Sequence, residues 1–309
     1  MPVARCGLRL PILYSPAMSR TATGPVLVLA AAALWGTTGT AQALGPDGIT
    51  PGGVAAVRMI GGATLLVYAF RRRATVPLRS LIGPALVWAV AAMAISQPLF
   101  FIGVSRTGVA VGTIVTIGSG PIIAGLLAWI VRGERVGRRW VLATVLSVGG
   151  AVLLVSGGAD AGIDPGGVLF ALGAGMAWAV YLVAAKALLD EHPAIFVVAV
   201  VFTGAAILLV PWLAVSHPGW ILTARGGGVA GWFVVTTALS YVLFATGLKS
   251  TPVAAAATLS LSEPLTAAVL GMTVLNEPIL LTTISGAVLV ALGLLVLSAE
   301  QPVEPLIDP

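Results

Sequence analysis

Ten apolar stretches, each about as long as a bilayer-spanning helix, constrain this chain more than any other feature. A transmembrane helix needs about 20 mostly apolar residues to cross roughly 30 Å of hydrocarbon. Since a segment in lipid must satisfy its own backbone hydrogen bonds, each stretch predicts a helix. The stretches, separated by short turns rich in Gly, Pro, Arg or Asp, cover residues 24–44, 53–70, 81–103, 108–131, 140–157, 167–188, 194–215, 228–248, 252–274 and 279–299.

Composition excludes a soluble protein. Of the 309 residues, 58% are hydrophobic and 9% are charged, and the mean hydropathy is +1.06. A soluble domain is about 45–50% apolar and about a quarter charged. With so few charged side chains a water-soluble enzyme of this length could not cover its surface, so the chain is a polytopic membrane protein. The single cysteine, Cys6, permits no internal disulfide.

The basic residues predict the orientation. With the N-terminus in the cytoplasm, Arg106 and Arg225 fall outside, as do Asp47, Asp160 and Asp164, and Arg58 lies within a span. Positive charge gathers on the cytoplasmic side of membrane proteins, so we predict both termini there. The pI of about 10 then reflects contact with anionic lipid, and no nucleic acid is implied. The residues placed inside are Arg5, Arg9, Arg20, Arg71, Arg72, Arg73, Arg79, Arg132, Arg135, Arg138, Arg139, Lys186 and Lys249.

The N-terminal region carries two ambiguous signals. Thr40-Ala41-Gln42-Ala43 imitates a signal-peptide cleavage site, but the apolar span before it is too long for a signal peptide, so we expect no cleavage. Residues 1–17 are neither apolar nor patterned. Met18, followed by Ser19-Arg20, is therefore an alternative native start.

The two halves of the chain are similar at a shift of 143–144 residues. Each half has five spans, an odd number, so the second half must be inserted upside down. Inverted repeats are typical of carriers whose substrate site lies near the midplane between the halves. We predict an N-terminal segment 1–23, a first repeat 24–157, an external linker 158–166, a second repeat 167–299 and a tail 300–309. The matched pairs include Trp35 with Trp178, Gly61 with Gly204, Gly103 with Gly247, Thr107 with Thr251, Pro121 with Pro264, Glu134 with Glu277 and Gly150 with Gly293.

Glu263 is the most informative polar residue, because it lies about halfway along span 252–274. An ionised carboxylate at that depth costs at least about 2.5 kcal/mol. Thr258, Ser262 and Thr266 are spaced at i, i+4 and i+8, which predicts a polar stripe beside Glu263. We expect Glu263 to bind substrate or a coupling proton. The alternative is a protonated acid that is hydrogen-bonded within the bundle.

Both matched spans contain a proline, and Pro264 predicts a local break in span 252–274. Pro264 has no N–H and leaves the carbonyl of Ser260 without its helical donor, and Pro121 does the same to Ile117. In span 108–131, Thr116 and Ser119 are candidates for lining a cavity. Alternatively, the small residues on that face allow close helix packing.

Aromatic and amide residues near the midplane complete the predicted site. They offer π-faces and hydrogen bonds to a zwitterion or a cationic amine, although a midspan Trp can also fill a helix seam. Arg58 is interpreted as structural, reaching the headgroups or a carbonyl terminus, and Glu134 and Glu277 as turn-fixing residues. His192 and His217 fall in loops. The predicted substrate-binding residues are Trp35, Thr38, Gln97, Thr116, Ser119, Trp178, Tyr181, Tyr241, Ser262 and Glu263.

The order of several short motifs resembles the drug/metabolite transporter superfamily in its ten-helix, EamA-like form. This resemblance implies transport of small molecules, often export of amino acids or other metabolites, across the bacterial plasma membrane. It also implies a central cavity surrounded by spans 1, 3, 4, 6, 8 and 9. The motifs are Ala33-Leu34-Trp35-Gly36, Arg58-Met59-Ile60, Ser105-Arg106-Thr107, Gly133-Glu134-Arg135, Glu263-Pro264 and Leu275-Asn276-Glu277-Pro278.

Other function classes fit less well. The sequence has no phosphate-binding Gly-x4-Gly-Lys-Ser/Thr loop, and its spans carry neither the Asp nor the His that intramembrane enzymes use. We expect a secondary carrier without cofactor or bound metal, whose partners are a small-molecule substrate and lipid; a homodimer is left open. A channel or a non-transporting scaffold is the alternative.

Overall fold

The computed structural model describes residues 17–71, 76–156, 164–216 and 218–298, and within these residues the fold is entirely helical. Three short 3₁₀ helices, η1 (Leu78–Leu81), η2 (Pro218–Leu222) and η3 (Ser260–Ser262), connect or interrupt the α-helices. The α-helices are α1 (Ala17–Ala43), α2 (Pro51–Arg71), α3 (Pro84–Thr107), α4 (Val109–Arg132), α5 (Arg138–Ser156), α6 (Pro165–Glu191), α7 (Ala194–Val215), α8 (Ala224–Ser250), α9 (Val253–Leu259), α10 (Glu263–Val274) and α11 (Leu281–Ser298).

All ten predicted spans are confirmed, with α9, η3 and α10 together forming the ninth. Several helices extend beyond the apolar stretch that predicted them, because polar side chains cap their ends. Asp164 accepts the amides of Gly166 and Gly167, so α6 begins before the predicted residue 167. Thr223 likewise accepts the amide of Gly226 and starts α8 before residue 228. Hydropathy locates a span but not its capped ends.

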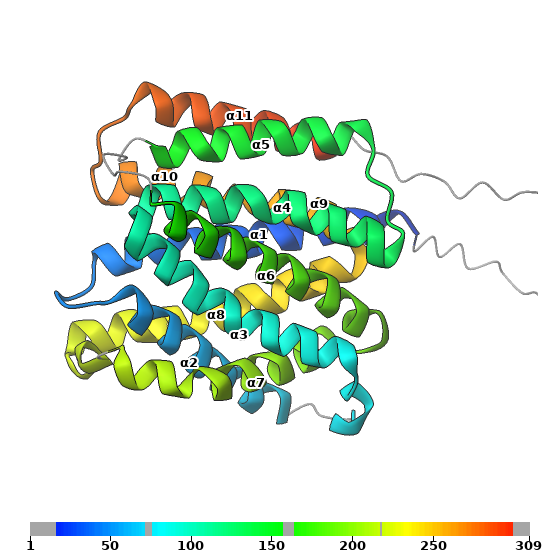
Figure 1. Ribbon diagram of the computed structural model, residues 1–309, viewed down its shortest axis with the longest axis horizontal. Helices are drawn as coiled ribbons and strands as arrows, with labels where there is room; N and C mark the ends of the chain where they lie inside the picture. Colours follow the sequence, from blue (N-terminus) through cyan, green and yellow to red (C-terminus); the bar gives the residue numbers. More distant parts are fainter. Residues whose placement is uncertain (1–16, 72–75, 157–163, 217, 299–309) are drawn as a thin grey trace, which may run out of the picture.

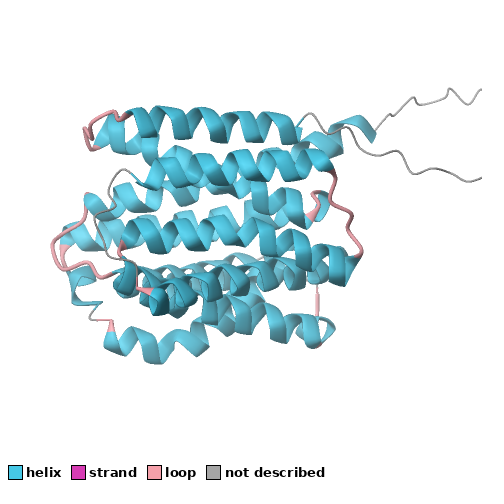
Figure 2. Ribbon diagram, turned by 45° about the horizontal axis from the view of Figure 1, so that its top comes forward, coloured by secondary structure: helices cyan, strands magenta, loops and turns pink. Residues whose placement is uncertain are grey.

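The helices run side by side along one direction, with α5 and α11 at one edge of the bundle and α2 and α7 at the other (Figure 1). A second view, turned by 45°, shows that the described elements are helices joined by loops (Figure 2). Large side chains on the outside, including Trp88, Leu169 and Ile207, are more than 60% exposed. An outer surface of this kind suits lipid and not water.

The described chain begins and ends at the same end of the bundle (Figure 1). We call it the basic end, because α2, α4 and α8 finish there with Arg71, Arg132 and Lys249 in their last turns. The side chain of His192, after α6, bonds Ser80 of η1 and so brings that turn to the same end. Some residues used to predict the orientation lie outside the described part of the chain: Arg5, Arg9, Arg72, Arg73 and Asp160. His217 and most of the predicted terminal segments and linker also lie outside it.

Close glycine contacts relate the two repeats by a pseudo-two-fold axis. When a residue of the first repeat contacts a residue of the second repeat, the two residues matched to them, 143 or 144 positions away in the sequence, contact each other as well. Both repeats are therefore built alike and packed antiparallel, as predicted. The matching contacts are Gly24 on Gly247 with Gly167 on Gly103, Gly61 on Val234 with Gly204 on Val90, and Gly150 on Gly286 with Gly293 on Ala143.

The ends of α4 and α10 repeat this relation in their backbone. Gly133 has φ 68° and Asn276 has φ 56°, both in the left-handed region. In each turn the following glutamate amide reaches back to a carbonyl six residues earlier: Glu134 to Ala128 at 3.2 Å and Glu277 to Gly271 at 3.0 Å. This Schellman-type ending explains why a Gly or an Asn stands before each matched glutamate.

The glycine contacts predict a sharp difference between two neighbouring residues of α5. A Cβ atom on Gly150 would lie 2.6 Å from the Gly286 carbonyl oxygen, whereas a Cβ on Gly149 would meet nothing within 4 Å. We expect Gly150→Ala to lower the free energy of unfolding by about 1–3 kcal/mol through overpacking. Thermal unfolding of the purified protein in detergent measures this. Equal midpoints for Gly150→Ala and the control Gly149→Ala would contradict the packing of α5 on α11.

Candidate substrate site between the two repeats

The ninth span breaks where Glu263 begins α10. The predicted break is present, but the Ser260 carbonyl is not left without a donor: it accepts the amide of Glu263 at the end of η3. A 3₁₀ turn replaces the missing α-helical bond, and Pro264 then occupies the first turn of α10, where no N–H is needed. In the matched position α4 continues through Pro121 as one helix. The break is therefore confined to the second repeat.

The predicted stripe beside Glu263 is divided between different neighbours. Thr258 shares a hydrogen bond of 2.9 Å with Thr144 of α5, while Thr266 packs against Gly36 of α1. Ser262 donates to the carbonyl of Leu259 at 2.9 Å. Each 3₁₀ residue advances the chain by about 120° instead of 100°, so the residues after η3 face a different direction from those before it. The i, i+4, i+8 spacing places residues on one face only in a continuous α-helix, and this span is divided into α9, η3 and α10.

Glu263 itself lies where α1 crosses α10. A Cβ atom on Gly36 would lie 2.6 Å from the Glu263 carbonyl oxygen, so α1 approaches the start of α10 at a residue without a side chain. The Glu263 side chain is half-buried. Among the described residues its carboxyl group has neither a hydrogen bond nor a direct ion pair. No intra-bundle partner therefore supports the alternative of a hydrogen-bonded structural acid.

Arg58 of α2 points into the bundle. Its Nε donates to the Thr237 hydroxyl of α8 at 3.1 Å, and its positive charge acts on the carboxyl of Glu263 and the hydroxyl of Tyr241. The predicted reach toward the headgroups is therefore wrong. The short α2–α8 contact turns the guanidinium inward, and sequence spacing alone could not reveal it.

Four of the predicted aromatic residues meet at the centre of the bundle. Tyr241 contacts Trp35 at a centroid distance of 5.0 Å and Tyr181 at 6.3 Å. The rings come from four helices, α1, α6, α7 and α8, so the cluster joins both repeats. We call Trp35, Trp178, Tyr181, Phe202, Tyr241 and Phe244 the central aromatic cluster.

Several polar atoms of this cluster have no hydrogen-bond partner among the described residues. The Nε1 of Trp35 is buried without an acceptor, although Trp35 is only 6% exposed. The hydroxyls of Tyr181 and Tyr241 make no hydrogen bond to another described residue. Unpaired polar groups are costly in a membrane interior. Buried atoms without a partner in the described structure also occur outside this cluster, at Ser147, Trp212 and Trp220.

Other predicted residues lie away from this cluster or are already bonded. Thr116 donates to the carbonyl of Ala171 on α6 at 3.0 Å, and Ser119 packs against Gly175 of the same helix. The Gln97 amide donates to Ser96 on its own helix, and Thr38 is half-buried one turn beyond Trp35. Thr116 and Ser119 thus join α4 to α6, which matches the alternative of close helix packing.

Sequence reasoning missed Phe202, Thr237 and Phe244. Phe244 had a signal, because its match with Phe100 belongs to the repeat. Phe202 and Thr237 have no such signal in the sequence, because many other apolar and hydroxyl residues surround them. Only the packing of α7 and α8 brings Phe202 to Tyr241 and Thr237 to Arg58.

A network of charged groups joins four helices at the basic end. Arg132 of α4 bonds Glu134 at 3.0 Å and Asp190 of α6 at 2.9 Å. Glu134 also accepts the amide of Val253 at 2.9 Å and so caps α9. The ammonium of Lys186 donates to the carbonyls of Leu248 and Lys249 at the end of α8. The expected turn-fixing role of Glu134 holds and extends across helices.

The opposite end is joined more weakly. Arg106 and Asp164 stand 4.0 Å apart with side chains 51% and 41% exposed, a geometry worth little in free energy. Arg225 donates to the backbone carbonyl of Leu44. Bonds between helices that involve charged groups therefore gather at the basic end of the described structure.

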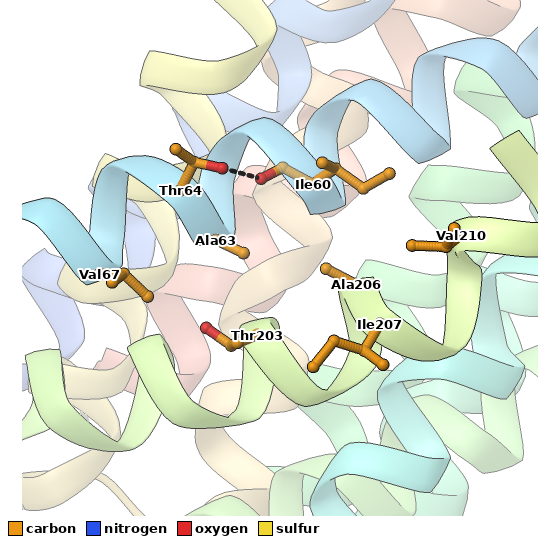
Figure 3. A pocket seen from close by; sticks show the side chains of 8 residues that line it. All are labelled: Ile60, Ala63, Thr64, Val67, Thr203, Ala206, Ile207 and Val210. Atoms are coloured by element: carbon orange, nitrogen blue, oxygen red, sulfur yellow. Dashed lines mark hydrogen bonds between the residues drawn. The ribbon is translucent and has the colours of Figure 1, made fainter.

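Two hollows lie outside the central cluster. One, of about 330 Å³ between α2 and α7, is lined mainly by apolar residues such as Ile60, Ala206 and Val210 (Figure 3). Its Thr64 hydroxyl donates to its own helix, as the dashed bond in Figure 3 shows. The other, of about 400 Å³, lies at the basic end beside Lys186 and Lys249. Neither contains Glu263 or Arg58, and no group of metal-ligating residues occurs among the described ones.

The duplicated helical fold, with polar groups meeting at its centre, defines a multi-pass membrane transport protein of the drug/metabolite transporter superfamily. The EamA-like transporter family model matches residues 22–156 and 165–299. The chain belongs to this family, which confirms the resemblance seen in its motifs.

Two named relatives are transporters, and one solved structure has the same fold. The chain is 45% identical over 276 residues to the uncharacterized transporter YwfM of Bacillus subtilis, with 89% of this chain and 93% of the relative covered. It is 30% identical to the threonine/homoserine exporter RhtA of Escherichia coli K12, with 88% of each covered. A solved crystal structure has the same fold with TM-score 0.76 at 19% identity, covering 89% of this chain and 96% of that one.

The matched glutamates of the two repeats predict unequal effects on stability. Glu134 bonds Arg132 and caps α9, whereas Glu277 is exposed in its turn. Since a lost cap costs about 0.5–2 kcal/mol, we expect Glu134→Ala to lower the thermal midpoint clearly. Glu277→Ala should stay within about 0.5 kcal/mol of the parent protein. A larger loss for Glu277→Ala would show that the network is not the stabilising feature.

Proposed function

We propose that this chain is a secondary transporter that exports a small amino acid-like or amphiphilic metabolite by alternating access. The observation that carries the proposal is the half-buried carboxyl of Glu263, which begins a half-helix in mid-span and has no bond to another described residue. Discontinuous helices that present such groups between inverted repeats are typical of carrier binding sites. The exporter name of the 30% identical relative supports the class of cargo and the direction.

We place the protein in a bacterial plasma membrane with both termini in the cytoplasm. The described chain starts and finishes at the basic end, where Arg71, Arg132 and Lys249 end their helices. Positive residues accumulate on the cytoplasmic side of such membranes. The basic end is then the face from which an exporter takes up its substrate.

Alternating access requires the charged network at the basic end to open. The bonds of Arg132 to Asp190 and of Glu134 to Val253 connect helices of both repeats, so they must break before substrate enters from that side. The weaker Arg106–Asp164 contact opposes opening at the other end less. In this proposal the described conformation is one in which the cytoplasmic side is closed.

Glu263 is the acid that we assign to coupling. Its neighbouring charged and titratable groups are Arg58 and Tyr241, and a proton and a cationic substrate group would compete for its carboxylate. Competition of this kind links export of substrate to entry of protons.

Reconstituted protein tests the coupling. In liposomes with an imposed pH gradient we expect the wild type to accelerate substrate movement at least tenfold. Glu263→Gln should still exchange substrate, less well, but with no response to the gradient. Glu277→Gln removes an exposed acid of the same repeat and should respond like the wild type. An unchanged response of Glu263→Gln would remove Glu263 from coupling.

A channel or a non-transporting scaffold remains the alternative function. Counterflow separates them, because only a carrier accumulates labelled substrate against an unlabelled pool. Saturable counterflow is the result we expect, whereas ohmic conductance would identify a channel and neither activity a scaffold.

A further inference from the structure

The turn after α4 joins the two repeats at the basic end. The Glu134 carboxylate of this turn accepts the amide of Val253, the first residue of α9, at 2.9 Å. On α5, the Nε1 of Trp140 donates to the carbonyl of the next residue, Ala254, at 3.0 Å. The helices α4 and α9 also pack on each other. Glu134 therefore holds the start of a helix of the second repeat against the end of a helix of the first.

The matched place at the opposite end is not joined in this way. Val253 corresponds at a shift of 144 residues to Val109, the first residue of α4, and Glu134 corresponds to Glu277 in the turn after α10. The pseudo-two-fold axis thus relates the α4–α9 contact to a contact between α10 and α4. Within the described structure α4 packs on α3, α5, α6 and α9, but it has no comparable packing on α10.

The Glu277 side chain lies on its own helix instead. Its carboxylate occupies the space in which a Cβ atom on Gly271 would stand, and it has no hydrogen bond or ion pair with another described residue. The residue matched to Gly271 is Ala128, which is buried. Because the methyl group of Ala128 fills the equivalent space, Glu134 has no such position on α4.

The start of α4 lacks the acceptor that Glu277 can supply. The first amides of a helix have no acceptor within the helix, and a carboxylate is favourable there. The residue before α4 is Gly108 and the residue before α9 is Pro252, and neither has a side chain that can accept these amides. At α9 Glu134 fills that role. Since the turns that carry Glu134 and Glu277 have the same backbone bond, the second turn can present its glutamate to α4 in the same manner.

We propose that Glu277 is a gate residue, which leaves Gly271 and caps the first amides of α4 when the repeats move to their other conformation. Its bond then closes the opposite end, while Glu134 releases Val253 and the basic end opens. This inference rests on the proposed transport function and supplies a closing contact for the side of the membrane that is open in the described conformation. The two matched glutamates thus act in turn, one in each state.

Cross-linking of two cysteines measures closure at the opposite end. Ser105 and Pro278 are exposed there, and the residues matched to them, Lys249 and Arg135, line one hollow at the closed basic end. In proteoliposomes, a chain with Cys6 replaced by serine carries Ser105→Cys and Pro278→Cys and is treated with a short bifunctional thiol reagent. The rate of cross-linking follows the fraction of protein that is closed at this end, even where that fraction is small.

Variants of the gate should change this rate in opposite directions. Glu277→Ala removes the cap from α4 and should slow cross-linking at least about threefold. Gly271→Ala fills the space of the carboxylate and meets no nearer atom than those of Glu277, so it should accelerate cross-linking to a similar extent. Glu277→Gln keeps an acceptor oxygen and is the matched control, with a rate close to that of the parent.

Three results would overturn the inference. They are an unchanged rate in Glu277→Ala, no acceleration in Gly271→Ala, and a rate in Glu277→Gln as low as that in Glu277→Ala. Each single-cysteine chain is treated with a monofunctional maleimide, so that a change in thiol reactivity is corrected for and not mistaken for a change in closure.

The same measurement separates this inference from the proposed function. If the parent cross-links at a rate that Glu277→Ala does not change, the opposite end closes without Glu277, and alternating access stands while the gate role falls. If neither the parent nor Gly271→Ala cross-links although both cysteines react with maleimide, the opposite end does not close. Alternating access itself would then be overturned.

Discussion

The bilayer interior supplies no hydrogen bonds, so every polar group that enters it must find a partner within the protein or its ligand. Most described polar side chains obey this constraint through their own helix or a neighbour, as Thr116 does on Ala171 and Thr258 on Thr144. Glu263 and the hydroxyl of Tyr241 do not. These groups lie where the repeats meet, and in the proposed function a substrate pairs with them.

The scaffold is symmetric, but its chemistry is not. Glycine contacts such as Gly150 on Gly286 and Gly293 on Ala143 recur through the pseudo-two-fold axis, since close helix packing needs small residues in both halves. The position matched to Glu263 is Gly120, where a Cβ atom would lie 3.3 Å from the ring of Trp178. Glu263 and Arg58 therefore have no counterpart in the other repeat, although the backbone is two-fold symmetric. The charged network is also stronger at the basic end than at the opposite end.

Much of the fold follows from the sequence, because hydropathy, charge asymmetry and repeat spacing are local or periodic signals. The spans, the repeat and the break before Glu263 belong to this class. The predicted polar stripe is not one continuous face, because the 3₁₀ turn η3 rotates the chain within it. The inward direction of Arg58 depends on its bond to Thr237, which is 179 residues away in the sequence. The bonds of Glu134 to Val253 and of Arg132 to Asp190 are long-range in the same way. Such contacts depend on how helices rotate against each other, which no pattern within one helix specifies.

The central claim is that the region between the repeats opens to the two sides of the membrane in turn. Accessibility of one cysteine at Thr38, half-buried on α1 one turn beyond Trp35, tests it most directly in a chain whose Cys6 is replaced by serine. The account predicts that Thr38→Cys reacts with membrane-impermeant thiol reagents added to either side, and that substrate slows both reactions. Reaction from one side alone, unaffected by substrate, would contradict it.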